Sequence, residues 1–429
     1  MTLVFIVLFG LMLLGVPVAF AILSSGMAYL VSTDTSLLMV AQRLVYGLNS
    51  FTLLAVPLFI LVGNLMDFGG ISKRLTDWAK SLLGWLPGGL GIVTVFSCAI
   101  FAALTGSGPA TVAAIGSIML PSMVKAGYAK DTSAGLVAAA GALGPIIPPS
   151  IPMIIYGVTM NLSIPAMFVA GVVPGLVIAG ALAVVNIFFA YKNPEVIRQA
   201  GTMKFDLRLS LKLFWKALGA LGLPVLILGG IYGGVFTPTE SAAVGIVYAL
   251  IVGFALRELK IKDLPHILIS SLKTSTMVNF IIAAASLFSW VVSKSQIGTV
   301  ISDAFISLVG GSQTVYLLAL VIILLIVGCL MDNVAATLIL APILIPVGIT
   351  LGCNELHIGM LFCICLVVGF VTPPFGYNLF TAVSISGLNF KQIVKGSLPF
   401  LITEILLLFV FAFVPGIITW LPSVMGFTF

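Results

Sequence analysis

Four short segments of the chain place helix-breaking residues beside small hydroxyl and amide side chains, within stretches that are otherwise apolar. Their sequences are LTGSGPAT (104–111), GPIIPPSIP (144–152), LMDNVAAT (330–337) and GFVTPPFGYN (369–378). Proline has no main-chain N–H and clashes with the preceding helical turn, so it leaves carbonyl oxygens without helical partners. Unpaired carbonyls are costly in an apolar medium unless they line a cavity or bind a ligand. We therefore expect these four segments to bind ions or solute.

Carbonyl, hydroxyl and amide oxygens suit sodium, because they hold a hard cation without burying a charge of their own. The sequence predicts two sodium sites, each between a hydroxyl- or amide-bearing segment and a Pro-Pro pair. The side chains expected to serve are those of Thr105, Ser107, Asn333, Thr337 and Thr372. No arginine is clearly placed to hold a carboxylate, so sodium and the positive ends of half-helices would bind an anionic solute. The residues expected to contact that solute are Ser107, Ser150, Asn333 and Asn378.

Other reactive side chains have simpler structural interpretations. Ser107 lies in a Thr-Gly-Ser-Gly motif that resembles an intramembrane serine protease, but a nucleophile needs a nearby base. The two histidines, His266 and His357, are expected near opposite membrane edges, so an enzyme is disfavoured. Asp332 is interpreted either as the N-cap of its half-helix or as a functional acid, and Glu240 as part of a capping box.

Three further charges lie near or within apolar segments, namely Asp67, Lys273 and Glu404. We expect them to pair or to reach the membrane interface, while a role in coupling stays open. The five cysteines show no metal-ligand spacing and are expected to be small apolar filler.

Long apolar helices must carry these segments. Of the 429 residues, 61% are hydrophobic and 7% are charged, whereas a soluble domain has about 25% charged residues. The apolar stretches are continuous rather than alternating, which predicts spanning helices and not a β-barrel. We therefore expect an all-α polytopic membrane protein in contact with lipid, with residues 1–31 as its first spanning helix. The net charge of +6 is attributed to loops at the membrane edge and not to nucleic-acid binding.

The chain contains an internal repeat. When residues 110–174 are shifted by 225 positions, prolines and glycines of the two segments align. The pairs are Pro121 with Pro346, Gly127 with Gly352, Gly144 with Gly369, Pro148–Pro149 with Pro373–Pro374, Gly171 with Gly396 and Pro174 with Pro399. Matched proline and glycine predict matched breaks in the helices.

The distribution of basic residues predicts that the two copies are inverted. The segment 192–216 is rich in Lys and Arg and is placed in the cytoplasm. A first hairpin, 88–124, is flanked by basic residues, whereas the flanks of a second hairpin, 312–352, are almost free of them. The first hairpin would enter from the cytoplasm and the second from the periplasm, as in secondary transporters. The N-terminus would be cytoplasmic and the C-terminus periplasmic.

The expected organisation is N-terminal scaffold helices (1–66), a first repeat (67–191), a basic cytoplasmic loop (192–216), second scaffold helices (217–293), a second repeat (294–396) and a C-terminal helix (397–429). Within the repeats, the helices are expected to break at 144–152 and 369–378. Two amphipathic stretches, 71–83 and 297–308, are expected to lie in the membrane interface as stiff connecting arms.

The segments TGSGPAT, GPIIPPSIPMIIYG, MDNVAAT and TPPFGYNLF resemble the large membrane subunit of tripartite ATP-independent periplasmic (TRAP) transporters, and the resemblance extends over nearly the whole chain. It implies a separate small four-helix membrane subunit, a periplasmic solute-binding protein and a place in the bacterial inner membrane. It also implies sodium-driven uptake of a small organic acid by an elevator motion. C4-dicarboxylates and sialic acids are the substrates implied, and the sialic acid type is the one suspected.

The family's sodium sites map onto this chain by motif. The first corresponds to Ser107, Gly144, Ile147 and Pro148, and the second to Asn333, Gly369, Thr372 and Pro373. The two tips differ, Gly-Ser-Gly-Pro against Asp-Asn-Val-Ala, so the two ion affinities need not be equal. The main alternative is a stand-alone sodium- or proton-coupled organic anion transporter of the same architecture. A channel is a more distant alternative, and the absence of a Walker A sequence argues against an ATP-driven pump.

Overall fold

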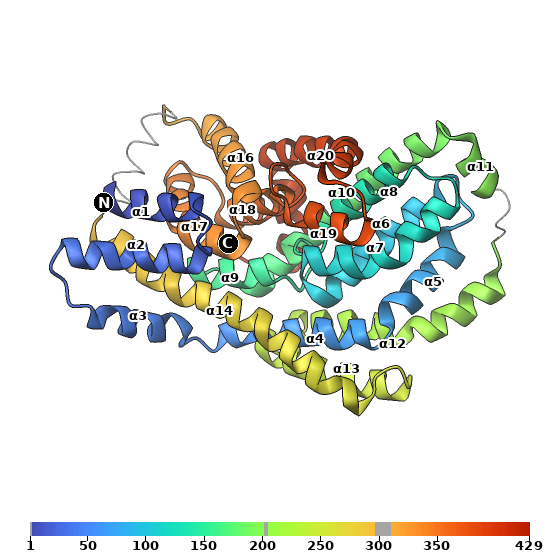
Figure 1. Cartoon of the computed structure of the whole chain (residues 1–429), viewed down its shortest axis with the longest axis horizontal. Helices are drawn as coiled ribbons and strands as arrows, with labels where there is room; N and C mark the ends of the chain where they lie inside the picture. The colour runs from blue at the N-terminus through green and yellow to red at the C-terminus, as the bar shows by residue number, and fades with distance from the viewer. Residues whose placement is uncertain (1, 201–204, 297–309) are drawn as a thin grey trace.

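The computed structural model describes residues 2–200, 205–296 and 310–429, and every regular element in these residues is a helix (Figure 1). Within the described part of the chain, seven helices are long and apolar enough to cross a membrane. An eighth span is obtained if Leu38–Leu48 and Thr52–Phe68, which bend by 70° at their junction, are counted together. The expectation of an all-α polytopic membrane protein is therefore confirmed.

The N-terminal region folds as short helices. They are α1 (Thr2–Leu13), α2 (Val18–Ser32), α3 (Leu38–Leu48), the 3-10 helix η1 (Thr52–Leu54) and α4 (Ala55–Phe68). The expectation of one spanning helix over residues 1–31 is wrong, because the chain turns between α1 and α2, which pack against each other. The N–H of Val16 bonds the carbonyl of Leu11, and Pro17 cannot continue a helix. With 12 residues, α1 is about 18 Å long, shorter than a bilayer core.

The next helices hold the first pair of predicted breaks. They are α5 (Ile71–Leu83), α6 (Gly89–Thr105), α7 (Gly108–Lys125), α8 (Lys130–Gly141), α9 (Ile151–Met160) and α10 (Ile164–Tyr191). Helix α5 has the bounds of the first expected arm and buries Ile71, Leu75 and Ala79. Its position in a membrane interface stays a prediction. The second expected arm, 297–308, lies outside the described residues.

The middle of the chain contains α11 (Pro194–Ala200), α12 (Leu207–Tyr232), α13 (Pro238–Ala255), the 3-10 helix η2 (Ile261–Asp263) and α14 (Leu264–Lys294). The basic segment 192–216 was expected to be a loop, but it contains α11 and the first turns of α12. Asp206 is the reason that a helix begins here, because its side chain accepts bonds from the N–H groups of Arg208 and Leu209.

The last helices hold the second pair of breaks. They are α16 (Gln313–Leu330), α17 (Asn333–Thr350), α18 (Glu355–Gly369), α19 (Tyr377–Ser386), α20 (Phe390–Phe413) and α21 (Gly416–Val424). The expectation of a single C-terminal helix over 397–429 is wrong. Helix α20 ends at Phe413, because Pro415 has no N–H to continue it, and α21 starts directly after that proline.

The helices α6–α10 and α16–α20 follow the same order of lengths. Helices α7 and α17 have 18 residues each, and α9 and α19 have 10 residues each. The two series also interlock, because α7 packs against α19, α9 against α17, and α8 against α20. As a result, each hairpin of one series is held by the helix that follows the break of the other series (Figure 1).

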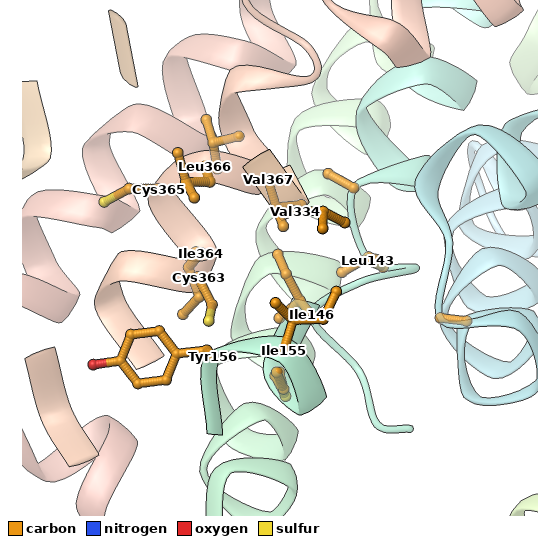
Figure 2. Close-up of a cluster of buried hydrophobic side chains, with 14 of the residues drawn as sticks. Leu143, Ile146, Ile155, Tyr156, Val334, Cys363, Ile364, Cys365, Leu366 and Val367 are labelled. Atoms are coloured by element: carbon orange, nitrogen blue, oxygen red, sulfur yellow. The ribbon is translucent and has the colours of Figure 1, made fainter. Parts of the chain in front are cut away.

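A cluster of apolar side chains packs around the first break. Figure 2 shows Leu143 and Ile146 from the first break beside Ile155 of α9, Val334 of α17 and Cys363 of α18. All five side chains are buried. The five cysteines of the chain are free and buried, as expected for apolar filler. This packing holds the first break without using the polar groups that it carries.

Candidate functional site

The first hairpin reverses direction within a few residues. Helix α6 ends at Thr105, Gly106 has a left-handed φ of 61°, and Ser107 is the extended N-cap of α7. The Ser107 side chain does not cap α7. Thr105 is bonded locally: its hydroxyl contacts that of Thr111 at 3.3 Å and donates to the carbonyl of Phe101 at 3.4 Å. The tip therefore leaves the half-buried Ser107 hydroxyl available to a ligand.

The first break packs main chain against this tip. A Cβ built on Gly144 would lie 2.5 Å from the carbonyl oxygen of Ser107, so only glycine permits this approach. Likewise, a Cβ built on Gly106 of the tip would lie 2.7 Å from the carbonyl oxygen of Pro149 in the break. Ser107 and Gly144 thus come together as expected. The Ile147 side chain lies against Gly175 of α10, and the expected role of the Ile147 and Pro148 carbonyls stays a prediction.

Ser150 has a local role at the same break. It is the N-cap of α9, where its hydroxyl accepts from the N–H of Met153 at 3.4 Å and donates to the carbonyl of Pro145 at 2.6 Å. These two bonds use its donor and one lone pair, so the second lone pair is what remains for a solute. Its expected contact with solute stays a prediction.

Asn378 joins the two series of helices. It lies at the start of α19, yet its amide nitrogen donates to the carbonyl of Ala138 in α8 at 3.0 Å. Its amide oxygen has no hydrogen-bond partner although the residue is fully buried. That oxygen would lie 2.8 Å from a Cβ on Gly108, at the N-terminus of α7. Asn378 therefore belongs to the surroundings of the first tip, which the sequence reasoning missed.

A signal for this placement was present in the repeat. With the shift of 225 positions, Asn378 aligns with Met153, and the tip residue Asn333 aligns with Gly108. Both asparagines thus lie in the second copy, one at its tip and one on the short helix after its break, whereas the first copy has glycine and methionine at the aligned positions. Such an exchange of a polar for an apolar residue at buried positions indicates a local function for the amide.

The second tip carries the most under-satisfied polar groups of the site. Asp332 is the N-cap of α17, and its carboxylate accepts from the N–H of Val334 at 2.8 Å, so the N-cap interpretation holds. Asn333 is 2% exposed and neither atom of its amide has a hydrogen-bond partner. The hydroxyl of Thr337, one turn later on the same helix, is also buried and unpartnered. The second tip thus buries three polar atoms without hydrogen-bond partners, namely the two amide atoms of Asn333 and the hydroxyl oxygen of Thr337.

The second break is arranged differently from the first. A Cβ on Gly369 would collide with the main chain of Gly328 in α16, so the ends of α16 and α18 touch. The Thr372 hydroxyl donates to the carbonyl of Val368 at 3.0 Å, and Pro373 is half-buried. Because neither amide atom of Asn333 has a hydrogen-bond partner, no hydrogen bond joins that amide to Thr372 or Pro373. The two copies therefore share the positions of their prolines and glycines but differ in packing, because Gly144 lies against the tip whereas Gly369 lies against α16.

These groups fit a cation held by neutral oxygens. Burying a polar group without a partner costs about 1–3 kcal/mol, and the two sites hold four such atoms. Three are oxygens that a cation could bind, those of the Asn333 amide, the Thr337 hydroxyl and the Asn378 amide, and the fourth is the Asn333 amide nitrogen, a donor. Within the described ranges, no three His, Cys, Asp or Glu side chains are grouped to hold a metal. Amide, hydroxyl and main-chain oxygens suit an alkali cation better than a transition metal.

The remaining charged and basic residues have separate surroundings. Glu240 completes a capping box with Thr237 at the start of α13, as predicted. His266 packs against the ring of Phe68, and His357 bonds the carbonyl of Phe411. Neither imidazole is thus engaged with Ser107.

The three charges whose roles were open differ in exposure. Lys273 is exposed on α14, whereas Glu404 is buried in α20 with both carboxylate oxygens unpartnered. Asp67 is exposed at the end of α4 and accepts from the Ser72 hydroxyl at 3.2 Å.

Comparison with known proteins identifies the family. Residues 5–417 match the family described as "Tripartite ATP-independent periplasmic transporter, DctM component". The C4-dicarboxylate TRAP transporter large permease protein DctM of Vibrio cholerae is 38% identical over 446 residues, which covers 99% of this chain and 97% of that protein. The sialic acid TRAP transporter large permease protein SiaM of the same organism is 35% identical, with 96% of each chain covered.

Two further similarities add context. The isethionate TRAP transporter permease protein DctMQ of Oleidesulfovibrio alaskensis is 38% identical over 96% of this chain, which spans 65% of that protein. The solved structure of Neisseria gonorrhoeae MtrF, described as one of a class of antimetabolite efflux pumps, has a TM-score of 0.59 at 17% identity. The matched region covers 90% of this chain and 86% of the MtrF chain. At that identity the likeness concerns the fold alone.

Proposed function

Because the chain belongs to the DctM family of TRAP transporter large permease proteins, we propose that it couples sodium entry to the uptake of a small organic acid. Transport permeases, and not enzymes, make up this family. The observation that carries the proposal is the set of buried polar atoms without partners at the two breaks. The three oxygens among them would remain a net cost to folding unless an ion satisfied them, whereas the Asn333 amide nitrogen is a donor and needs an acceptor.

The two proposed sodium sites differ in composition. The first combines Ser107, Thr105, the main chain around Gly144 and the expected carbonyls of Ile147 and Pro148 with the amide oxygen of Asn378. The second combines Asn333 and Thr337 with the main chain after Gly369, including Thr372 and Pro373. Support for both comes from the close approach of tip and break at the first site and from the unpartnered atoms at the second.

Sodium binding would favour an anionic solute. Helices α7 and α17 begin at the two tips, so their positive ends point at the same region as the bound ions. A carboxylate placed there would be attracted by the ions and would in turn raise their affinity, because linkage between two ligands is reciprocal. Relatives are named for a C4-dicarboxylate, sialic acid and isethionate, all small organic anions.

The proposed mechanism is an elevator motion within an inverted repeat. The matched order of α6–α10 and α16–α20 and their cross-packing support one moving unit that contains both breaks. Helices α1–α4 and α12–α14 would form the scaffold. The chain would span the bacterial inner membrane with its N-terminus in the cytoplasm and its C-terminus in the periplasm. A small membrane subunit and a periplasmic binding protein would complete the transporter.

The test is uptake of a radiolabelled organic acid into proteoliposomes that contain this chain and its small subunit, with the cognate binding protein added outside. We expect uptake only with an inward sodium gradient and only with the binding protein. Uptake by this chain alone from free solute would favour the stand-alone transporter. Uptake driven by a proton gradient in the absence of sodium would contradict the proposed coupling.

A further inference from the structure

A cavity of about 310 Å³ lies between the first tip and the scaffold helices α4 and α14. Thr105 and Ser107 line it on the tip side, and Asn64, Asp67 and Thr274 line it on the scaffold side. Its volume falls in the range of sites that hold small organic ligands. Because one wall belongs to the hairpin and the other to the scaffold, a solute in this cavity would touch both.

The scaffold wall presents hydrogen-bond acceptors. The amide nitrogen of Asn64 donates to the hydroxyl of Ser271 at 2.8 Å, which turns the amide and leaves its oxygen as an acceptor. The Thr274 hydroxyl donates to the carbonyl of Ser270 at 3.3 Å, so only its lone pairs remain. Asp67 accepts one bond from Ser72 and keeps a second carboxylate oxygen. All three groups therefore match a ligand that donates hydrogen bonds.

The tip wall has the opposite character. The N-terminus of α7 starts at Ser107, and its first N–H groups and positive dipole end face the tip region. This wall suits the carboxylate of a solute, whereas the scaffold wall suits hydroxyl groups. A second carboxylate at the scaffold wall would meet the negative charge of Asp67, and the second N–H of the Asn64 amide would be the donor left to it among these three side chains.

We propose that this cavity selects a hydroxylated monocarboxylate, such as a sugar acid, over a dicarboxylate, with Asp67 and Asn64 as specificity-determining residues. The inference rests on the proposed function, because it requires that the hairpin tip holds the carboxylate of a transported acid.

The test measures binding to the purified full-length chain in sodium-containing buffer, by calorimetry or by ligand-induced thermal shift. The probes are gluconate, a hydroxylated monocarboxylate, and succinate, a dicarboxylate. The wild-type chain should bind gluconate at least about tenfold more tightly than succinate, since each unmatched charged group costs about that factor. Asp67→Asn should weaken gluconate binding and strengthen succinate binding. The control Asp34→Asn, at an exposed acid between α2 and α3, should change neither affinity.

A second variant keeps the proposal testable if Asp67→Asn does not fold. Asn64→Ala removes a neutral acceptor, so it should weaken gluconate binding without improving succinate binding. Equal affinity of the wild-type chain for both acids, or variants that leave the ratio unchanged, would overturn the assignment of specificity while leaving the proposed function intact. A folded chain that binds neither acid in sodium would also overturn the specificity assignment, whereas the proposed function is overturned separately, by the absence of sodium-driven uptake in the proteoliposome assay.

Discussion

At the scale of single residues, the buried amide of Asn378 carries the clearest sign of function. Its nitrogen bonds Ala138 across 240 positions of sequence, while its oxygen has no partner. A residue kept for packing would satisfy both ends or be replaced by an apolar side chain, which is often neutral or stabilising. The unpaired oxygen beside Gly108 is therefore interpreted as a ligand for the ion at the first tip.

Asn378→Ala should reduce the sodium affinity of one site by roughly tenfold or more, because it removes one oxygen from the ion. Asn186→Ala is the matched control, since Asn186 is also buried and donates to a distant carbonyl, that of Gly88, at 2.9 Å. Both variants should lower the melting temperature, but only Asn378→Ala should alter the sodium dependence of that temperature. An identical sodium response in the two variants would remove Asn378 from the site.

At the scale of elements, the breaks in the helices were predictable from local sequence, and their partners were not. Proline and glycine are strong local signals, so the ends of α6, α8, α16 and α18 follow from the motifs. The reversal before Pro17 was missed because apolar residues continue on both sides of it. The contact of Asn378 with α8 depends on packing between distant helices, which a motif does not contain.

The approach of the first break to its tip depends on the absence of a side chain at Gly144. Gly144→Ala would place a methyl group against the carbonyl of Ser107, and both partners are main chain, so neither can turn away. We expect loss of sodium-dependent uptake and destabilisation of about 1–3 kcal/mol. Gly180→Ala in α10 is the control, because a Cβ there meets nothing within 4 Å. It should be neutral or stabilising, and retained uptake in Gly144→Ala would contradict the role of this contact.

At the scale of the whole molecule, the orientation of the two hairpins decides whether the repeat is inverted. Residue 125 ends α7 and residue 350 ends α17, and both side chains are exposed. Because the five native cysteines are buried, single introduced cysteines can be labelled with little background. Lys125→Cys should react with a membrane-impermeant maleimide from the cytoplasmic side, and Thr350→Cys from the periplasmic side. Labelling of both from the same side would exclude the inverted arrangement.

The central claim is that each break binds one sodium ion through neutral oxygens, and equilibrium binding of radiolabelled sodium to the purified chain tests it most directly. The account predicts two ions per wild-type chain and one per Asn333→Leu chain. In sodium-free buffer that variant should be at least as stable as the wild type, because leucine removes two buried polar atoms without partners. Absence of saturable sodium binding, or the same number of ions in both proteins, would contradict the account.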